Sequence, residues 1–331
     1  MQLESVLVHV GLDRVGDGLL KLPFVRGLRR AFPSARITWL AGKETSVYAN
    51  VLAPYVQGLL DEVIENAGIG REPGELLRPT PLRDRRFDLV IDTQRIVWTS
   101  LSVRRVRHGT FLSPALRFLL SARRPARGYI PPPSMQRQML DLLELASGLS
   151  FPTPANLDLP SDPAAEADVA RLLPEGEAYV GLAPGSGGLP KCWPLERFVE
   201  LARLQIERGR KPVLILGPAE KDWLPGLREA LPQALFPLQE AGIEARHRFA
   251  PAFTMALAER LTAAVANDSG VGHMLAVGGA PLVSLFGPTV PEKFMPMTRN
   301  LRIVRASEHG GREMHHIPLA RVADELEKAL A

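Results

Sequence analysis

Short apolar runs typical of buried strands alternate with longer segments of helical periodicity, and this alternation restricts the fold more than any other feature of the chain. Residues 5–10 (SVLVHV) predict a buried strand, and residues 18–32 after them carry apolar side chains at helical spacing. Strands that alternate with helices predict parallel sheets with helical crossovers. The pattern therefore predicts an α/β fold.

The alternation continues along most of the chain. Further strands are predicted at residues 37–40, 62–65, 87–92, 178–183, 212–216, 265–266 and 301–304. Further helices are predicted at residues 44–52, 114–122, 134–147, 195–208, 252–264 and 319–330, with another that ends near residue 231. Pro23 is expected near the start of the regular part of the first helix.

A proline-rich segment, FPTPANLDLPSDP at residues 151–163, interrupts the alternation. Proline and short polar residues at this density are typical of an interdomain linker. A chain of 331 residues is also long enough for two domains. We therefore expect domains at residues 1–150 and 164–331, each a doubly wound, Rossmann-like parallel sheet, with a cleft between them.

Glycine-rich loops follow four predicted strands, at residues 11–17 (GLDRVGD), 183–191 (APGSGGLPK), 216–220 (LGPAE) and 267–273 (NDSGVGH). Ligands of such sheets bind beyond the carboxyl ends of the strands. In the second loop, glycines let the backbone approach a ligand, Ser186 adds a hydroxyl and Lys191 adds a positive charge, which suits a diphosphate. The alternative is a glycine-rich surface turn, because the Walker and dinucleotide patterns are absent.

The last of these loops opens a predicted helix. Its N-cap residue types are Asn267, Asp268 and Ser269. Gly270 leaves backbone N–H groups accessible, and His273 is expected on the first turn, so this helix start favours a phosphate. An ordinary capped helix is the alternative, and these residues alone leave both open.

The first loop carries Asp13, Arg14 and Asp17. An acid just before a helix is often only its N-cap. At the end of a strand, a carboxylate can instead act as general base on a sugar hydroxyl, and Arg14 can hold an anionic acceptor. Position alone does not separate the two roles of Asp17.

Composition restricts the chemistry further. Cys192 is the single cysteine, so the chain has no internal disulfide and suits a reducing compartment. The sequence shows no leader pattern and no apolar run near the roughly 20 residues that cross a bilayer, so we expect a cytoplasmic protein. No metal is predicted, because the histidines form no HxxxH or Cys–His grouping and the adjacent His315 and His316 cannot share a helix face.

Residues 93–140 contain nine arginines and no acidic residue, although the net charge of the chain is only +4. A solvated basic face is one interpretation. Nucleic acid is disfavoured, because few aromatic residues lie among the arginines and no nucleic-acid fold signature is present. We favour an anionic acceptor or an anionic lipid surface, since arginine is the preferred partner of phosphates and carboxylates.

Taken together, these segments resemble glycosyltransferase family 9, the heptosyltransferase-like enzymes of lipopolysaccharide assembly. The resemblance is carried by residues 11–42, by APGSGGLPKCWPLERFVELA at 183–202, by LILGPAEKD at 214–222 and by residues 267–289. It implies a GT-B fold, with the acceptor in the N-terminal domain and an ADP-sugar donor, typically ADP-heptose, in the C-terminal domain.

The resemblance also implies inverting, metal-independent sugar transfer to a lipopolysaccharide-core or related glycan acceptor, with no cofactor besides the donor. The family's general base falls on Asp17. Its donor-binding positions fall on Ser186, Lys191, Glu220, Asp268, Ser269, Gly270 and His273. Asp13 and Arg14 stand where the family usually has serine, and they are the predicted acceptor contacts.

Two other classes of protein share parts of this pattern. A nucleotide-sugar 2-epimerase has the same two-domain architecture and acts on the donor alone. A non-catalytic nucleotide-sugar or anion-binding protein would bind ADP without turnover. The Gly16–Asp17 match to the family's first loop favours transfer over both, and residues 93–140 then suggest an anionic glycolipid held by charge at the inner face of the cytoplasmic membrane.

Overall fold

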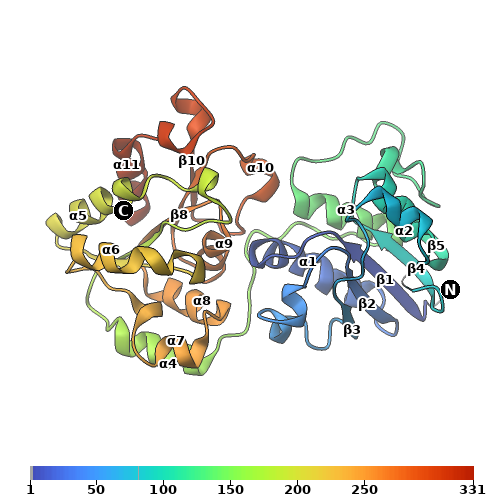
Figure 1. The fold of residues 1–331 in the computed structure, drawn as a ribbon, viewed down its shortest axis with the longest axis horizontal. Helices are drawn as coiled ribbons and strands as arrows, with labels where there is room; N and C mark the ends of the chain where they lie inside the picture. Colours follow the sequence, from blue (N-terminus) through green and yellow to red (C-terminus); the bar gives the residue numbers. More distant parts are fainter. Residues whose placement is uncertain (1–2, 81) are drawn as a thin grey trace. The chain divides into compact units, whose positions relative to one another are not determined.

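The chain forms two compact α/β units. A computed structural model describes residues 3–80 and 82–331, with unit 1 ending at Pro154 and unit 2 beginning at Ala155. This boundary falls inside the proline-rich segment at residues 151–163. Figure 1 shows unit 1 in blue to green and unit 2 in light green to red. In the described residues, no helix is both long and apolar enough to cross a membrane.

Unit 1 contains a five-stranded parallel sheet in the order β3-β2-β1-β4-β5. Its strands are β1 Ser5–Val10, β2 Arg36–Ala41, β3 Glu62–Ile64, β4 Arg86–Asp92 and β5 Arg107–Leu112. Its helices are α1 Val15–Ala31, α2 Val97–Arg104 and α3 Met135–Ser147. Short 3-10 turns lie at η1 Val47–Ala49, η2 Ala53–Tyr55, η3 Pro73–Leu77 and η4 Ala115–Phe118.

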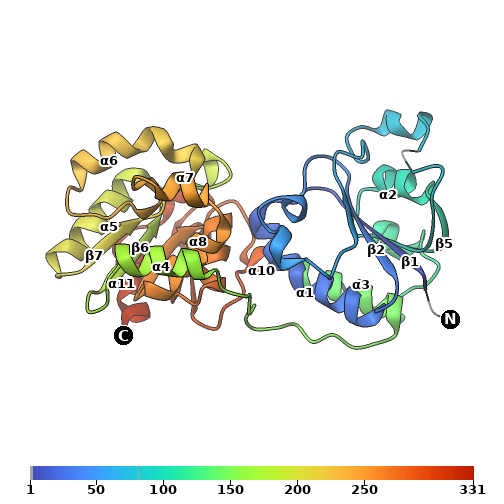
Figure 2. The same ribbon diagram turned by 90° about the horizontal axis from the view of Figure 1, so that it is seen from below.

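Side chains of the central strands of unit 1 are buried on both faces of the sheet. Leu7 of β1 and Val90 of β4 share an apolar cluster with Val103 of α2. Helices α1 and α3 pack against each other and lie side by side in Figure 1 and Figure 2. Gly27 permits this contact, because a Cβ there would stand 2.6 Å from the side chain of Leu143.

Unit 2 contains a second five-stranded parallel sheet, in the order β10-β9-β8-β6-β7. Its strands are β6 Tyr179–Ala183, β7 Lys211–Leu214, β8 Ala263–Asn267, β9 Leu282–Phe286 and β10 Leu301–Arg305. Its helices are α4 Pro163–Leu172, α5 Leu195–Glu207, α6 Leu224–Ala230, α7 Ile243–His247, α8 Pro251–Arg260, α9 Gly270–Val277, α10 Pro291–Phe294 and α11 Leu319–Leu330. Its 3-10 turns are η5 Leu189–Lys191, η6 Pro218–Trp223, η7 Pro237–Gln239, η8 Ala306–His309 and η9 Met314–His316.

Alternate side chains of β6 enter two different cores. Val180 and Leu182 pack in a cluster with residues of α5, α6 and α11. Tyr179 and Ala183 pack in another cluster, with residues of α4, α8 and α9. Figure 2 shows α4 beside α8, and the two helices are in contact. Successive side chains of the strand point to opposite faces of the sheet, so helices pack on both faces.

The structure corrects two predicted helices. Residues 44–52 contain only the short 3-10 turn η1, which the Ser46 hydroxyl caps by accepting from the backbone N–H of Tyr48 at 3.2 Å. The predicted helix at 114–122 is η4, where Leu116, Arg117 and Phe118 have φ of 50°, 54° and 65°. An α-helix cannot contain three left-handed residues.

Two helix boundaries also differ from prediction. The helix predicted at 252–264 ends at Arg260, and Ala263 and Ala264 belong to β8. Helix α1 begins at Val15, so Pro23 lies in its interior and Asp17 in its first turn rather than before it. Helix α2 and strand β5 were absent from the prediction.

Candidate active site

The predicted site residues lie beside the switch points of the two sheets, where the order of strands reverses. The switch point is between β1 and β4 in unit 1, and between β6 and β8 in unit 2. Asp13, Arg14 and Asp17 follow β1, Lys191 follows β6, and Asp268 follows β8. Ligands of doubly wound sheets bind beyond the strand ends at such a point.

In unit 2, a lysine–aspartate pair connects the loops after β6 and β8. The Lys191 Nζ lies 2.9 Å from Oδ2 of Asp268, and the Thr289 hydroxyl donates to the same oxygen at 2.7 Å. The Asp268 side chain is 8% exposed and that of Lys191 is 36% exposed. An ammonium carries three donors, so Lys191 can bind a further anion from solvent. The sequence patterns gave no role to Thr289.

Hydrogen bonds to the backbone hold these two loops together. The Asn267 side-chain amide donates to Pro184 O at 2.7 Å, and its oxygen accepts from the backbone N–H of Trp193 at 3.1 Å. The Ser186 hydroxyl donates to Asp268 O at 3.2 Å. Asn267 is therefore a bridge between loops and not the N-cap.

Helix α9 begins immediately beyond this bridge. Its N-cap is Ser269, whose hydroxyl accepts from the backbone N–H of Gly272 at 3.4 Å. Gly270 is the first helical residue, and His273 is buried in the helix. The structure therefore brings together Ser186, Lys191, Asp268 and the amino end of α9, which is suited to an anion.

Glu220 lies against the same loop. Its Oε2 accepts from the backbone N–H of Gly217 at 2.9 Å, and burial raises the pKa of its carboxyl. A Cβ at Gly185 would stand 2.3 Å from the carboxyl carbon of Glu220, so a larger residue there would displace this carboxylate. Burial and then the charge of Glu220 raise the pKa of the Cys192 thiol, which disfavours a nucleophilic thiolate.

In unit 1, Asp13 is enclosed by hydrogen-bond donors. Its Oδ1 accepts from the Lys21 Nζ at 2.6 Å, and its Oδ2 accepts from Trp39 Nε1 and the Ser46 hydroxyl, each at 2.7 Å. The Asp13 side chain is 0% exposed. The acceptor contact predicted for Asp13 stays a prediction, and this geometry favours a role in holding the loop. Lys21 was not among the predicted site residues.

Asp17 is half-buried in the first turn of α1, whose N-cap is the exposed Arg14. Burial, followed by the charges of Asp13 and Asp17, raises the pKa of Tyr48 well above its ordinary value. The Tyr48 hydroxyl therefore stays protonated and donates to Gly18 O at 2.6 Å, which holds the turn that bears Asp17.

A second buried network, absent from the predictions, lies at the switch point of unit 1. Asp92 at the end of β4 accepts from the hydroxyls of Ser100 and Ser113 at 2.5 and 2.9 Å, and lies 2.8 Å from His9 Nδ1. His9 and Asp92 are fully buried. The network ties β1 and β4 to the segments that follow β4.

The arginines of residues 93–140 divide into two groups. Arg105 and Arg123 donate to main-chain carbonyls, and Arg137 forms ion pairs with Asp141 and Glu144. These arginines stabilise unit 1. Arg124 also donates to a main-chain carbonyl, that of Leu119 at 3.4 Å, whereas Arg104, Arg107, Arg117 and Arg127 are exposed.

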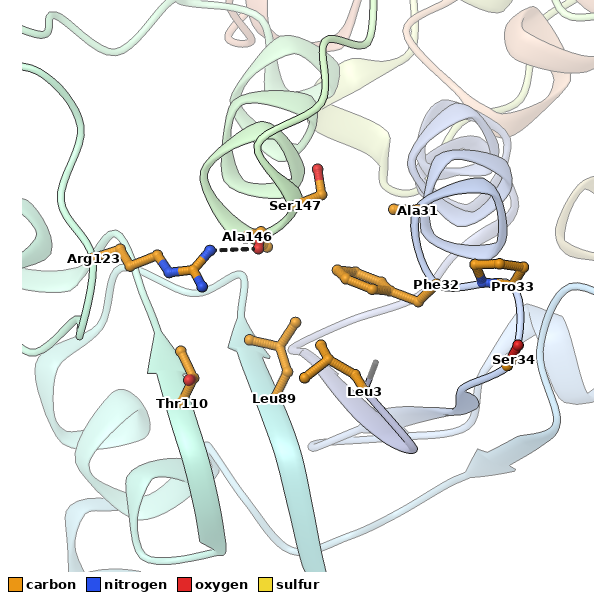
Figure 3. Close-up of a pocket in the computed structure, with 10 residues that line it drawn as sticks. All are labelled: Leu3, Ala31, Phe32, Pro33, Ser34, Leu89, Thr110, Arg123, Ala146 and Ser147. Atoms are coloured by element: carbon orange, nitrogen blue, oxygen red, sulfur yellow. Dashed lines mark hydrogen bonds between the residues drawn. The ribbon is translucent and has the colours of Figure 1, made fainter. Parts of the chain in front are cut away.

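A cavity of about 330 Å³ in unit 1 lies away from the switch point (Figure 3). Its lining includes Leu3, just before β1, and Phe32 and Ser34, just before β2. Arg123 borders it and donates to Ala146 O at 2.8 Å. The cavity thus adjoins the amino ends of these strands, opposite the ends at which such sheets bind ligands.

The structure corrects the argument that His315 and His316 cannot contribute to one metal site because adjacent residues do not share a helix face. Glu313, His315 and His316 each offer a ligand atom, and these atoms all lie within 4.8 Å of one another. The two adjacent histidines lie on the 3-10 turn η9 with their rings stacked, at a centroid separation of 4.2 Å. Helix-face geometry therefore does not apply to them.

The sequence has relatives of known family. The profile of glycosyltransferase family 9 (heptosyltransferase) matches residues 80–317. Lipopolysaccharide heptosyltransferase 1 of Pseudomonas aeruginosa is 27% identical over 293 residues, a match that covers 85% of this chain and 78% of that protein. Lipooligosaccharide heptosyltransferase 2 of Haemophilus influenzae is 29% identical over 156 residues, and this match spans only 44% of each chain.

A solved Escherichia coli heptosyltransferase with ADP has a similar fold. The TM-score is 0.66, with 20% sequence identity, over 98% of this chain and 99% of that chain. This likeness and the two doubly wound sheets confirm the predicted GT-B fold. Because the family profile matches most of its length, the chain belongs to glycosyltransferase family 9.

Proposed function

We propose that this protein transfers a heptose from an ADP-sugar to a hydroxyl of a lipopolysaccharide-core or related glycan. Membership of the family supports sugar transfer, and the names of the Pseudomonas and Haemophilus relatives support heptose and a lipopolysaccharide or lipooligosaccharide acceptor. The observation that carries the donor assignment is the Lys191–Asp268–Thr289 group beside the amino end of α9.

In this proposal the donor diphosphate binds at the switch point of unit 2. The ammonium of Lys191 and the first N–H groups of α9 bind its oxygens. Ser186 and Ser269 provide hydroxyls, and His273 supports the same helix end. Glu220 accepts hydrogen bonds from donor hydroxyls. The solved Escherichia coli relative binds ADP, which supports this class of ligand.

Asp17 is the proposed general base. It takes the proton of the acceptor hydroxyl as that oxygen attacks the anomeric carbon from the face opposite ADP. The bond between the anomeric carbon and the diphosphate oxygen breaks, and ADP leaves with the bonding electrons. A single displacement inverts the anomeric configuration. Lys191 and α9 stabilise the charge on the leaving group, so we propose that transfer needs no divalent cation.

The acceptor is proposed to bind unit 1, with Arg14 as a contact for its anionic groups. We further propose that the protein acts in the cytoplasm, at the inner face of the membrane. The exposed Arg117, Arg124 and Arg127 support this, because arginine side chains bind anionic lipid. Salt-sensitive binding of the protein to anionic vesicles is the expected result, and partitioning that salt does not change contradicts the membrane contact.

The test of the reaction is the variant Asp17→Asn, assayed with ADP-heptose and a truncated lipopolysaccharide acceptor. Turnover is expected to fall about 10²–10⁴-fold, the usual contribution of a general base, while affinity for ADP changes little. Glu44→Gln, which neutralises an exposed carboxylate of unit 1, is the control. Near-normal turnover in Asp17→Asn would exclude Asp17 as the base.

The same assay separates the other two classes. Conversion of the donor without acceptor would indicate an epimerase. Binding of ADP with no turnover of the wild-type protein on a panel of truncated lipopolysaccharides would indicate a non-catalytic binding protein. Transfer with inversion at the anomeric carbon, observed by NMR of the product and unchanged in EDTA, is the result that the proposal requires.

A further inference from the structure

The geometry points to a binding site for a divalent transition-metal ion of the Zn²⁺ class on turn η9 of unit 2. We propose that Glu313, His315 and His316 are its ligands, with one carboxylate oxygen and two ring nitrogens within 4.8 Å of one another. None of the three belongs to the donor or acceptor residues assigned above. The site is therefore separate from the proposed sugar transfer.

The ligand chemistry selects the class of ion. Two imidazoles and a carboxylate suit Zn²⁺ and its transition-metal neighbours, whereas Mg²⁺ and Ca²⁺ prefer oxygen ligands alone. Zinc–nitrogen bonds of about 2.0–2.1 Å place tetrahedral ligand atoms roughly 3.3 Å apart. His315 Nδ1 and the Glu313 carboxylate are already 3.2 Å apart. Rotation of exposed side chains is therefore enough to close the site.

Exposure of the ligands lets an ion enter. The side chains of Glu313 and His315 are 75% and 58% exposed. Three protein ligands leave the fourth tetrahedral position to a water molecule.

The backbone of η9 is held firmly. Arg197 donates to the carbonyls of His315, at 2.7 Å, and of Ile317. Trp193 Nε1 also donates to Ile317 O, at 2.9 Å. A turn fixed at these points holds the backbone of the ligand residues in place, so that only side-chain rotation is needed to bind an ion.

The ring of His316 is positioned by two contacts. Its Nδ1 lies 3.2 Å from Glu313 O, and a hydrogen bond there leaves Nε2 as the nitrogen for a metal. The ring also lies flat against Gly311, where a Cβ would stand 2.3–2.6 Å from three ring atoms. Gly311 therefore belongs to the site although it is not a ligand.

The test uses the full chain without a histidine tag, stripped with EDTA and free of nucleotide. Titration with ZnCl₂ by calorimetry, and with Co²⁺ by visible absorption, is expected to show one ion per chain. His315→Ala and His316→Ala should each lower the affinity about tenfold or more. His108→Ala, whose imidazole lies in unit 1 at 2.7 Å from Val106 O, should bind as the wild type does.

Gly311→Ala provides a second test that keeps all three ligands. Its Cβ should displace the His316 ring and weaken Zn²⁺ binding about as much as loss of the ring, with no loss of thermal stability in EDTA. Absence of saturable Zn²⁺ binding by the wild type, or equal affinity in the wild type and both histidine variants, overturns the proposal. Because no nucleotide is present, neither result depends on the proposed sugar transfer.

Discussion

Both units carry a lysine–aspartate pair beside the switch point, but the two pairs have different surroundings. In unit 1 the side chains of Lys21 and Asp13 are 7% and 0% exposed, and Trp39 and Ser46 complete the partners of the carboxylate. In unit 2 the side chain of Lys191 is 36% exposed. The ammonium group of Lys21 is therefore buried in the fold, and that of Lys191 remains accessible to solvent.

This difference separates two uses of the same residue types. A buried ion pair leaves no donor for a ligand, and it fixes the loop in which it lies. A half-exposed pair holds its lysine in place while two of the ammonium's three donors remain available. The pair of unit 1 thus holds the turn that bears Asp17, and the pair of unit 2 leaves donors available for the ligand that we propose there.

The largest effect is expected from replacing the buried lysine. Lys21→Met leaves the Asp13 carboxylate buried without its cation, which costs about 3–5 kcal/mol of unfolding free energy. Lys191→Met should cost less than about 1 kcal/mol, because that pair is partly solvated. Hydrogen exchange measured by mass spectrometry resolves the two units, and protection should fall in α1 for the first variant.

The double variant Asp13→Asn/Lys21→Met removes both charges together. It should recover much of the stability that Lys21→Met loses, because no unpaired charge is left in the interior. Equal protection of α1 in the Lys21→Met and Lys191→Met proteins would contradict the contrast between the two pairs.

Affinity for ADP should show the opposite order. In the proposed donor site, Lys191→Met removes a charge-assisted hydrogen bond to the diphosphate, worth about 1.5–3 kcal/mol, so the Kd for ADP should rise about 10–100-fold. Lys211→Met, an exposed lysine paired with Glu177, is the matched control. Calorimetric titration measures both, and unchanged affinity in Lys191→Met would remove this lysine from the donor site.

A smaller effect is expected at the contact between Gly185 and Glu220. Gly185→Ala forces the Glu220 carboxylate away, because the new Cβ would lie 2.3 Å from the carboxyl carbon. Overpacking of this kind costs about 1–3 kcal/mol of unfolding free energy. Displacement of Glu220, a proposed donor contact, should also weaken ADP binding, by less than the loss of Lys191 does. Gly226→Ala meets open space on α6 and should leave ADP affinity unchanged.

The smallest effect concerns Glu220 and pH. Burial raises the pKa of its carboxyl, so the folded state holds the proton more tightly than the unfolded chain. The stability that the fold gains from this protonated carboxyl is fully present below the unfolded pKa of about 4.3, and it is lost as pH rises through the folded pKa. Glu220→Gln should therefore be more stable than the wild type at pH 8 but not at pH 4.

Urea unfolding at the two pH values measures this difference. Glu229→Gln, an exposed glutamate on α6, is the control. If Glu220→Gln gains no stability over the wild type at pH 8, burial is not the dominant cause of the raised pKa of Glu220.

Sequence patterns predicted the fold well where the signal is local. Strand β1 and helix α11 have the predicted bounds, because a β-branched run and a helical period need no information from elsewhere in the chain. Ala263 and Ala264 fall within the helix predicted at 252–264, and alanine has a high helix propensity. They lie instead in β8, which is buried between the two cores of unit 2, and this tertiary context decides against local propensity.

The site was predictable only to the level of its loops. Parallel strands end at one edge of a sheet, which brings the loops of Lys191 and Asp268 together. No spacing rule gives the partners of individual atoms. Thr289 reaches Asp268 from 21 residues away, and His315 stacks on His316 because η9 is a 3-10 turn, a geometry that the sequence did not reveal.

The position of the boundary at Pro154 has a consequence for synthesis of the chain. Unit 1 is continuous in sequence, so its five strands and α3 are synthesised before any strand of unit 2. At about 5–20 residues per second, residues 155–331 take roughly 9–35 s to follow, whereas mixed α/β domains fold in milliseconds to seconds. Unit 1, including its buried Lys21–Asp13 pair, can therefore fold before synthesis of unit 2 is complete.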